Sequence, residues 1–217
     1  MYQPAHFNAP DTAAVDEIVR RYPLANLVLA TAPGQPLSVD PVVLSCSGPV
    51  VAGAQLMGHI ARANPLSAMI TSADQPLQVT AIFMGPRAYI TPNWYPSKQV
   101  HHRVVPTYNY CTVVVHGRIC LADDPAQKLE IVRELTQQME RGRPDAWSVD
   151  DAPAEYIDQM LKSITGLRIE IDQVQAKFKI SQNRDPLDRG SVQMELESQS
   201  YQTDAQVMAN LMERFQP

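Results

Sequence analysis

Cysteines, long apolar runs and a leader segment are scarce or missing in this sequence. The 217 residues include three cysteines, at positions 46, 111 and 120, and their odd number and irregular spacing argue against a disulfide framework. No apolar run approaches the roughly 18 residues that a membrane span requires. The first ten residues lack the basic and apolar regions of a signal peptide. We therefore expect a cytoplasmic protein without a membrane partner.

Common signatures of nucleotide and metal binding are also missing. The chain has no nucleophile elbow, P-loop, dinucleotide-binding glycine pattern or zinc-ligand spacing. The adjacent His101 and His102 have no histidine four residues away, and no cysteine or carboxylate lies close by in sequence. We predict no metal site, and no Rossmann-type nucleotide site.

Acidic residues are nearly absent from the middle of the chain. Residues 41–122 contain a single acid, Asp74, against four arginines and one lysine, so this block carries about +4 while the whole chain carries -5. A surface of one sign favours a ligand of the opposite sign, which here would be an anion. Because β-strands are themselves poor in Asp and Glu, a block of strands without a ligand would show the same pattern. Both interpretations stay open.

The pattern of apolar residues predicts a mainly β protein with appended helices. Short β-branched segments, punctuated by Gly and Pro, fill residues 24–121, and one of them is PLSAMITSA at 65–73. The gaps between these segments are too short for crossover helices, which favours a closed or half-closed barrel. We expect a barrel domain at 1–180, with helices inserted at 124–165, and a C-terminal helical extension at 181–217.

Two details of this outline can be checked directly. The second inserted helix has an apolar face that we expect to be buried, formed by Tyr156, Ile157, Met160, Leu161 and Ile164. In the long strand that follows, apolar residues alternate on odd numbers up to Ile171 and on even numbers from Val174. Because strand side chains alternate between two faces, this phase shift predicts a β-bulge near residues 172–173.

Three segments carry candidate binding residues. In LMGHIARANP we interpret residues 59–64 as a short helical turn whose free N–H groups, with His59, Arg62 and Asn64, would hold a phosphate; the alternative is a capped surface turn. Residues 85–111 contain four tyrosines, one tryptophan and no acid, which indicates a ligand site, an aromatic corner or a dimer interface. The third segment, KISQNRD, would clamp a phosphate or a polar ring edge, or is a polar turn. Its hydrogen-bonding residues are Lys179, Ser181, Gln182, Asn183 and Arg184.

Several segments together resemble the PaiB-like, FMN-binding negative transcriptional regulators. They are MYQPAHF, GHIARANP, FMGPRAYITPNWY, VPTYNY followed by VHGRI, and KFKISQNR, in the order of that family and within about residues 1–190. Tyr108 stands where a tryptophan is expected, and Thr91 and Asn93 stand where serines are commoner. These departures keep the aromatic or polar character of the positions.

The resemblance implies an FMN-binding split β-barrel of the pyridoxamine-phosphate-oxidase type, a homodimer with flavin sites at its interface, and FMN as the cofactor. It implies that the turn near His59 contacts the phosphate, and that Asn109, Tyr110 and Thr112 lie beside the isoalloxazine ring. Trp94, Tyr95 or Tyr110 would cover the ring, Thr107 belongs to the same motif as Asn109, and KISQNR would serve the partner's site.

The function that the resemblance implies is negative regulation of transcription by a dimeric flavoprotein. Two alternatives remain: an FMN-dependent oxidoreductase of the split-barrel type, and a haem-binding relative with a histidine ligand. Charge gives weak support to DNA as a partner, because the residues after Lys179 carry six acids against three arginines. If DNA binds, residues 41–122 would have to supply the surface.

Overall fold

Six antiparallel strands form a closed barrel, in the order β1-β2-β3-β6-β5-β4, in this computed structural model. The structure describes residues 1–31, 33–199 and 204–216. The strands are β1 (Leu24–Leu29), β2 (Ser38–Ser45), β3 (Gln55–Ala61), β4 (Leu77–Ile90), β5 (Thr107–Ala122) and β6 (Ile164–Lys179). The α-helices are α1 (Thr12–Arg21), α2 (Pro65–Thr71), α3 (Ser97–His101), α4 (Pro125–Glu140), α5 (Ala154–Leu161), α6 (Pro186–Ser198) and α7 (Ala205–Arg214), and short 3-10 turns are η1 (Ala5–Phe7), η2 (Pro92–Trp94) and η3 (Val149–Asp151).

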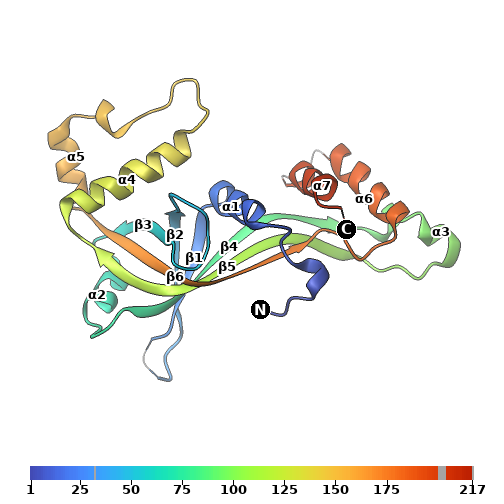
Figure 1. Cartoon of the computed structure of the whole chain (residues 1–217), viewed down its shortest axis with the longest axis horizontal. Helices are drawn as coiled ribbons and strands as arrows, with labels where there is room; N and C mark the ends of the chain where they lie inside the picture. Colours follow the sequence, from blue (N-terminus) through green and yellow to red (C-terminus); the bar gives the residue numbers. More distant parts are fainter. Residues whose placement is uncertain (32, 200–203, 217) are drawn as a thin grey trace.

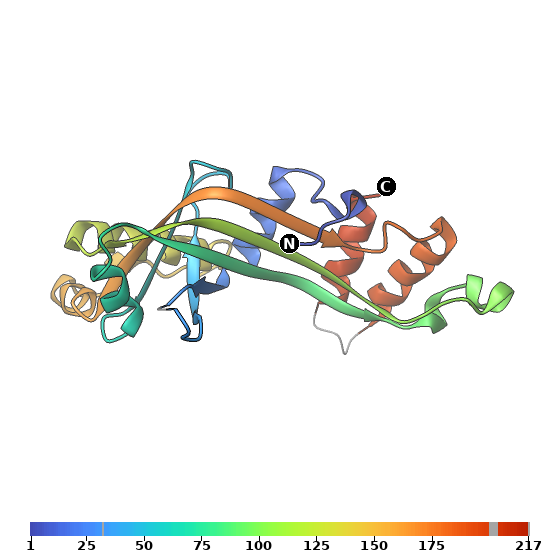
Figure 2. The ribbon, with the colours of Figure 1, turned by 90° about the horizontal axis from the view of Figure 1, so that it is seen from below.

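The last three strands of the sequence are about twice as long as the first three. Strands β4, β5 and β6 have 14, 16 and 16 residues, whereas β1, β2 and β3 have 6, 8 and 7. The surplus length leaves the barrel as a three-stranded sheet, which gives the molecule its elongated shape (Figures 1 and 2). We call this part the arm; it comprises residues 84–90, 107–112 and 174–179.

A bulge marks the place where the long strands bend. The register between β5 and β6 shifts between His116 and Gly117, which pair with Gln173 and Ile171 and leave Asp172 as the extra residue. The bulge predicted from the phase shift is therefore confirmed. Gly117 is required there, because a Cβ atom at this position would lie 2.2 Å from the carbonyl oxygen of Glu170.

Helices cover both ends of the molecule. Helices α4 and α5 lie between β5 and β6 in sequence and sit at the barrel end (Figure 1). Helices α6 and α7 pack on one face of the arm, and α3 lies at its tip. Val192, Leu196, Met208 and Met212 of α6 and α7 belong to the same buried cluster as the barrel side chains.

Three expectations about local structure are wrong. Residues 65–73 do not form a strand, because Asn64 accepts a hydrogen bond from the N–H of Leu66 and Pro65 occupies the first turn of α2. His59 accordingly lies within β3 and not in a helical turn. On α5, Tyr156 and Met160 are exposed and only Leu161 is buried, while Ile164 begins β6.

Candidate functional site

The candidate binding residues fall into separate groups. His59, Arg62 and Asn64 lie at the barrel end, whereas the other eleven lie along the arm and at its tip. His59 pairs with Gly166 and Tyr110 pairs with Lys179 on the shared strand β6. These partners are 13 positions apart, which corresponds to about 40 Å of extended strand. A single chain therefore does not bring the two groups together.

The barrel-end group is largely engaged in internal contacts. The Arg62 guanidinium lies 2.7 Å from the Asp123 carboxylate and donates to the carbonyls of Lys162 and Ile164 at 2.8 and 3.1 Å. The hydrogen bond from Arg62 lowers the pKa of Asp123. Asn64 caps α2 and donates to Asp40 at 2.9 Å. The guanidinium expected to bind a phosphate thus already has an anionic partner.

His59 is the member of this group that keeps an unused polar atom. Among the residues that the structure describes, none forms a hydrogen bond with its buried Nδ1, and burial lowers the pKa of the imidazole below its usual 6.5. The ring is therefore neutral at pH 7, so it offers a hydrogen bond and not a charge.

Part of the arm group lies underneath α7. Asn109 donates to the hydroxyl of Ser181 at 2.9 Å and accepts from the same hydroxyl at 3.2 Å, next to the sulfur of Met212 at 3.8 Å. Asn109 is fully buried, and Ser181 adopts a left-handed backbone conformation with φ of 65°. Because α7 covers this pair, neither side chain faces solvent.

The end of β6 folds back on itself beside this pair. The Gln182 side chain accepts from the N–H of Ile180 at 2.8 Å and donates to the carbonyl of Phe178. The Arg184 guanidinium lies 4.7 Å from the ring centroid of Tyr95, which is buried. Trp94 is half-buried and Asn183 is exposed.

The opposite face of the arm is partly exposed in the described part of the chain, although Thr112 and Lys177 are buried there. Directly paired residues of an antiparallel sheet share a face, and the register defines three rows there. The rows are Met84–Thr112–Lys177, Arg87–Tyr110–Lys179 and Tyr89–Tyr108. Met84, Arg87, Tyr89 and Tyr108 are exposed on it, and the Tyr89 and Tyr108 rings meet edge to face at 6.0 Å. We call these eight residues the open face.

Two lysines on the open face have no acidic partner within residues 1–31, 33–199 and 204–216. Lys177 is buried, at 8% exposed, and its ammonium lies within 5.5–5.8 Å of the Tyr110, Tyr2 and Phe7 ring centroids and donates to the Tyr2 carbonyl at 3.2 Å. The Lys179 ammonium donates to the Thr107 hydroxyl and, at 2.5 Å, to the Tyr108 carbonyl.

This arrangement favours an anion. Burial, together with the charges of Lys177 and Arg184, lowers the pKa of Lys179. Among the residues that the structure describes, neither lysine forms an ion pair. A bound anion would relieve the repulsion between these cations, and the neighbouring tyrosine rings offer a surface for a planar group.

Sequence reasoning found Tyr110, Thr112 and Lys179 on this face but missed Lys177. The signal was present: once the apolar residues of β6 alternate on even numbers, Lys177 and Lys179 must share the other face. The three rings around Lys177 were harder to foresee, because Tyr2 and Phe7 come from the opposite end of the chain.

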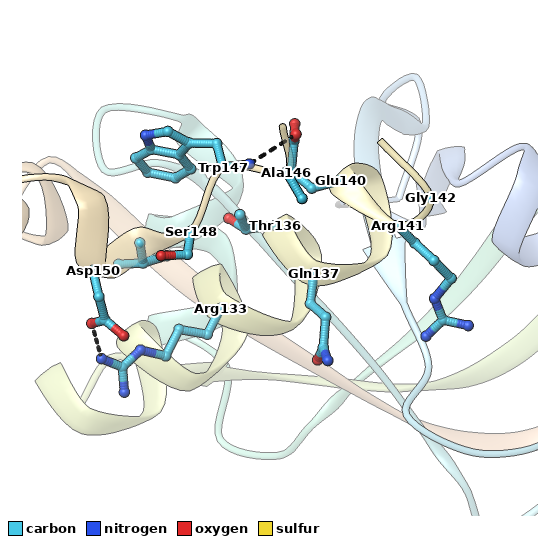
Figure 3. A pocket seen from close by; sticks show the side chains of 11 residues that line it. Arg133, Thr136, Gln137, Glu140, Arg141, Gly142, Ala146, Trp147, Ser148 and Asp150 are labelled. Carbon is cyan, nitrogen blue, oxygen red and sulfur yellow. Dashed lines mark hydrogen bonds and ion pairs between the residues drawn. The ribbon is translucent and has the colours of Figure 1, made fainter. Parts of the chain in front are cut away.

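A cavity lies away from the arm, between α4 and the segment that leads to η3. It has a volume of about 520 Å³, and Figure 3 shows the side chains that line it, among them Trp147, Thr136, Gln137 and Arg141. Its charged groups are largely paired: Arg133 meets Asp150 at 2.5 Å, and Glu140 accepts from the N–H of Trp147 at 3.2 Å. None of the candidate binding residues lines this cavity, and we favour the open face for a charged ligand.

The described residues offer neither a cluster of metal ligands nor a helix that could cross a bilayer. They contain no group of three or more His, Cys, Asp or Glu side chains placed to hold a metal ion. No helix in the described ranges combines the length and the apolar composition needed to cross a bilayer.

Comparison with known proteins identifies related sequences. The family model described as "Putative FMN-binding domain" matches residues 1–173. An uncharacterized protein of Aspergillus fumigatus is 32% identical over 166 residues, covering 63% of this chain and 64% of its own length. The "Protease synthase and sporulation protein PAI 2" of Bacillus subtilis is 32% identical over 163 residues, covering 73% and 72% of the two chains.

Solved structures share the fold. The FAD and haem binding protein of Mycobacterium smegmatis superposes with a TM-score of 0.56 at 14% identity, covering 79% of this chain and 73% of that one. This likeness and the closed six-stranded antiparallel barrel confirm the split-barrel fold that the sequence led us to expect.

Proposed function

The chain belongs to the family of the putative FMN-binding domain, and from this premise we propose that it is a dimeric flavoprotein whose flavin lies on the open face of the arm. The observation that carries the proposal is the pair of lysines, Lys177 and Lys179, on one face without an acidic partner. They would hold the phosphate of FMN, or of a related flavin.

The open face fits this cofactor in two respects. Lys177, Lys179 and the nearby Arg184 supply positive charge for a phosphate, which charge-assisted hydrogen bonds recognise well. Tyr110, with Tyr89 and Tyr108 in the neighbouring rows, supplies aromatic surface for the ring system. Flavin contributes redox chemistry when it is bound, and the role of these residues is to bind, orient and shield it.

The barrel-end residues would contact the flavin that is held by the arm of a second copy of the chain. About 40 Å of strand separates His59 from the lysines within one copy, which is too far for one flavin to contact both. In a homodimer, the arm of one copy and the barrel end of the other would meet the same flavin. The unpartnered Nδ1 of His59 would then find a hydrogen-bond partner.

For the biological role, we favour negative regulation of transcription. The resemblance described above supports it, and the Bacillus subtilis relative is named a protease synthase and sporulation protein. Flavin binding would be the sensory event, and residues 41–122 would supply the basic surface that DNA requires. The second candidate, an FMN-dependent oxidoreductase, uses the same cofactor site.

Titration with FMN and with riboflavin tests the cofactor proposal. We expect flavin absorption bands and protein-dependent quenching of flavin fluorescence, with FMN bound about 10- to 100-fold more tightly than riboflavin because of its phosphate. Equal affinity for the two ligands would contradict the role of the lysines, and a Soret band in the purified protein would favour the haem alternative.

A second pair of measurements separates the two roles. A regulator should retard a DNA fragment from upstream of its own gene, with an affinity that falls as salt is raised and changes with FMN. An oxidoreductase should instead oxidise reduced nicotinamide cofactors or reduced flavin at a rate proportional to its concentration. Turnover without any salt-dependent DNA shift would exclude the regulatory role.

A further inference from the structure

The two ends of the elongated molecule carry opposite charge. The turn at the arm tip, residues 91–106, contains Lys98, Arg103 and two histidines and no acid. We call it the tip hairpin. Residues 144–161, which lead into and include α5, contain five acids and no base. Figure 1 shows α3 of the tip hairpin and α5 at opposite ends of the long axis.

Both ends also expose apolar side chains. On the tip hairpin, Val100 is 82% and Val105 is 65% exposed. On α5, Tyr156 and Met160 are 53% and 40% exposed, and their spacing of four residues places them on one face of the helix. This is the face that amphipathic patterning predicts to be buried, so α5 has an apolar stripe that the described residues leave partly exposed.

Hydrogen bonds to α6 and within the turn hold the tip hairpin in place. The buried Asp188 of α6 accepts hydrogen bonds from the N–H and the hydroxyl of Ser97, at 3.0 and 2.7 Å. Lys98 donates to Asn93 at 2.6 Å within the turn. A surface fixed in this way loses little conformational entropy when it binds a partner.

From these observations we propose that a second copy of this chain is the partner, and that its tip hairpin covers the α5 helix of the first. The proposal rests on the homodimer proposed above and specifies its contacts. A two-fold axis across the long dimension turns one copy end for end, so each basic tip meets an acidic α5, and the contact occurs twice. Val100 and Val105 would pack against Tyr156 and Met160, with Arg103 beside Glu155 or Asp158.

Charge reversal provides the test. One variant carries Lys98→Glu and Arg103→Glu, and the other carries Glu155→Lys and Asp158→Lys. Sedimentation velocity over a range of concentrations should show that each variant dimerises at least about tenfold more weakly than the unchanged chain, because both contacts become repulsive. An equimolar mixture should regain the original dimerisation, since opposite charges face each other again at both contacts. The chain with all four substitutions should also dimerise normally.

A matched control reverses two exposed charges elsewhere, with Arg20→Glu and Glu197→Lys. This variant should dimerise like the unchanged chain. Circular dichroism of each variant verifies that it is folded, and Val100→Asp supplies an independent disruption of the apolar contact.

Three results would overturn the proposal: an unchanged chain that is monomeric, charge variants that dimerise normally, or a mixture that does not regain association. A tip variant that stays dimeric but no longer retards DNA would assign the hairpin to nucleic acid instead. The measurements are made with and without FMN, so a failure to bind flavin does not affect the outcome for the dimer contact.

Discussion

Asn109 and Ser181 exchange two hydrogen bonds beneath α7, although 72 residues separate them in the sequence. The pair ties the end of β6 to the middle of the arm and fixes the left-handed turn at Ser181. Buried polar pairs of this kind stabilise a fold mainly because breaking them leaves a buried group without a partner. The sequence motif that contains Asn109 thus has a structural reason to be there.

The first prediction concerns the stability of this pair. Replacing Asn109 by Ala leaves the Ser181 hydroxyl without its main partner, and we expect the free energy of unfolding in urea to fall by about 1–3 kcal/mol. Combining it with Ser181→Ala should give a non-additive total, with a coupling energy above about 0.5 kcal/mol. Asn183→Ala, at an exposed position, is the control. If Asn109→Ala abolished flavin binding at unchanged stability, Asn109 would be a ligand contact and not a structural residue.

The second prediction concerns the lysines of the open face. Lys177→Gln and Lys179→Gln should each raise the dissociation constant for FMN about tenfold, because each removes one charge-assisted hydrogen bond to the phosphate. Their effect on riboflavin should be small. Isothermal titration calorimetry measures both ligands, and Arg20→Gln, at an exposed cation of α1, is the charge-matched control. Equal losses for FMN and riboflavin would place the lysines near the ring and away from the phosphate.

The third prediction concerns the pH dependence that His59 creates. Burial lowers the pKa of this imidazole in the folded chain below the value of 6.5 in the unfolded chain. Between these two pKa values the unfolded chain binds a proton that the folded chain does not, so stability falls as pH decreases through 6.5.

Comparison of variants isolates this contribution from that of the carboxylates. Between pH 7.5 and pH 5.5 the free energy of unfolding should fall in both proteins. The decrease should be smaller in His59→Gln than in the unchanged chain, by up to about 1 kcal/mol. His102→Asn, at an exposed position, should behave like the unchanged chain. The same slope in all three proteins would mean that His59 titrates normally.

The fourth prediction concerns the bulge. Gly117→Ala places a Cβ atom against the backbone oxygen of Glu170, which cannot move without disturbing the ladder between β5 and β6. We expect the melting temperature to fall by several degrees, which corresponds to about 2 kcal/mol for a chain of this size. Gly48→Ala, where a Cβ atom meets nothing within 4 Å, should leave it unchanged. A normal melting temperature for Gly117→Ala would show that the bulge can open at little cost.

Local patterns predicted the framework of the fold well. The bulge at Asp172 was visible because a strand has a strict period of two, so one extra residue exchanges the faces of everything after it. Residues 65–73 were misassigned because a short apolar run fits a strand and a helix equally well. The capping side chain of Asn64 and the proline after it decide the matter.

Features that depend on distant partners could not be read from the sequence. Arg62 is visibly a cation, but nothing near it in sequence shows that Asp123 pairs with it. The pattern of α5 reveals which side is apolar, yet not that Tyr156 and Met160 stay 53% and 40% exposed in the fold. Likewise the alternation of β6 gives the face of Lys177, whereas the rings of Tyr2 and Phe7 reach it only through the fold.

Strands β5 and β6 run without interruption from the barrel into the arm, and this continuity has a mechanical consequence. A hinge between the two parts would have to break ladder hydrogen bonds in the same pair of strands that closes the barrel. We therefore expect the arm to move together with the barrel and not as an independent domain. We expect a displacement of the arm tip to reach the barrel as a twist of the paired strands β5 and β6, and not as a rotation about a hinge.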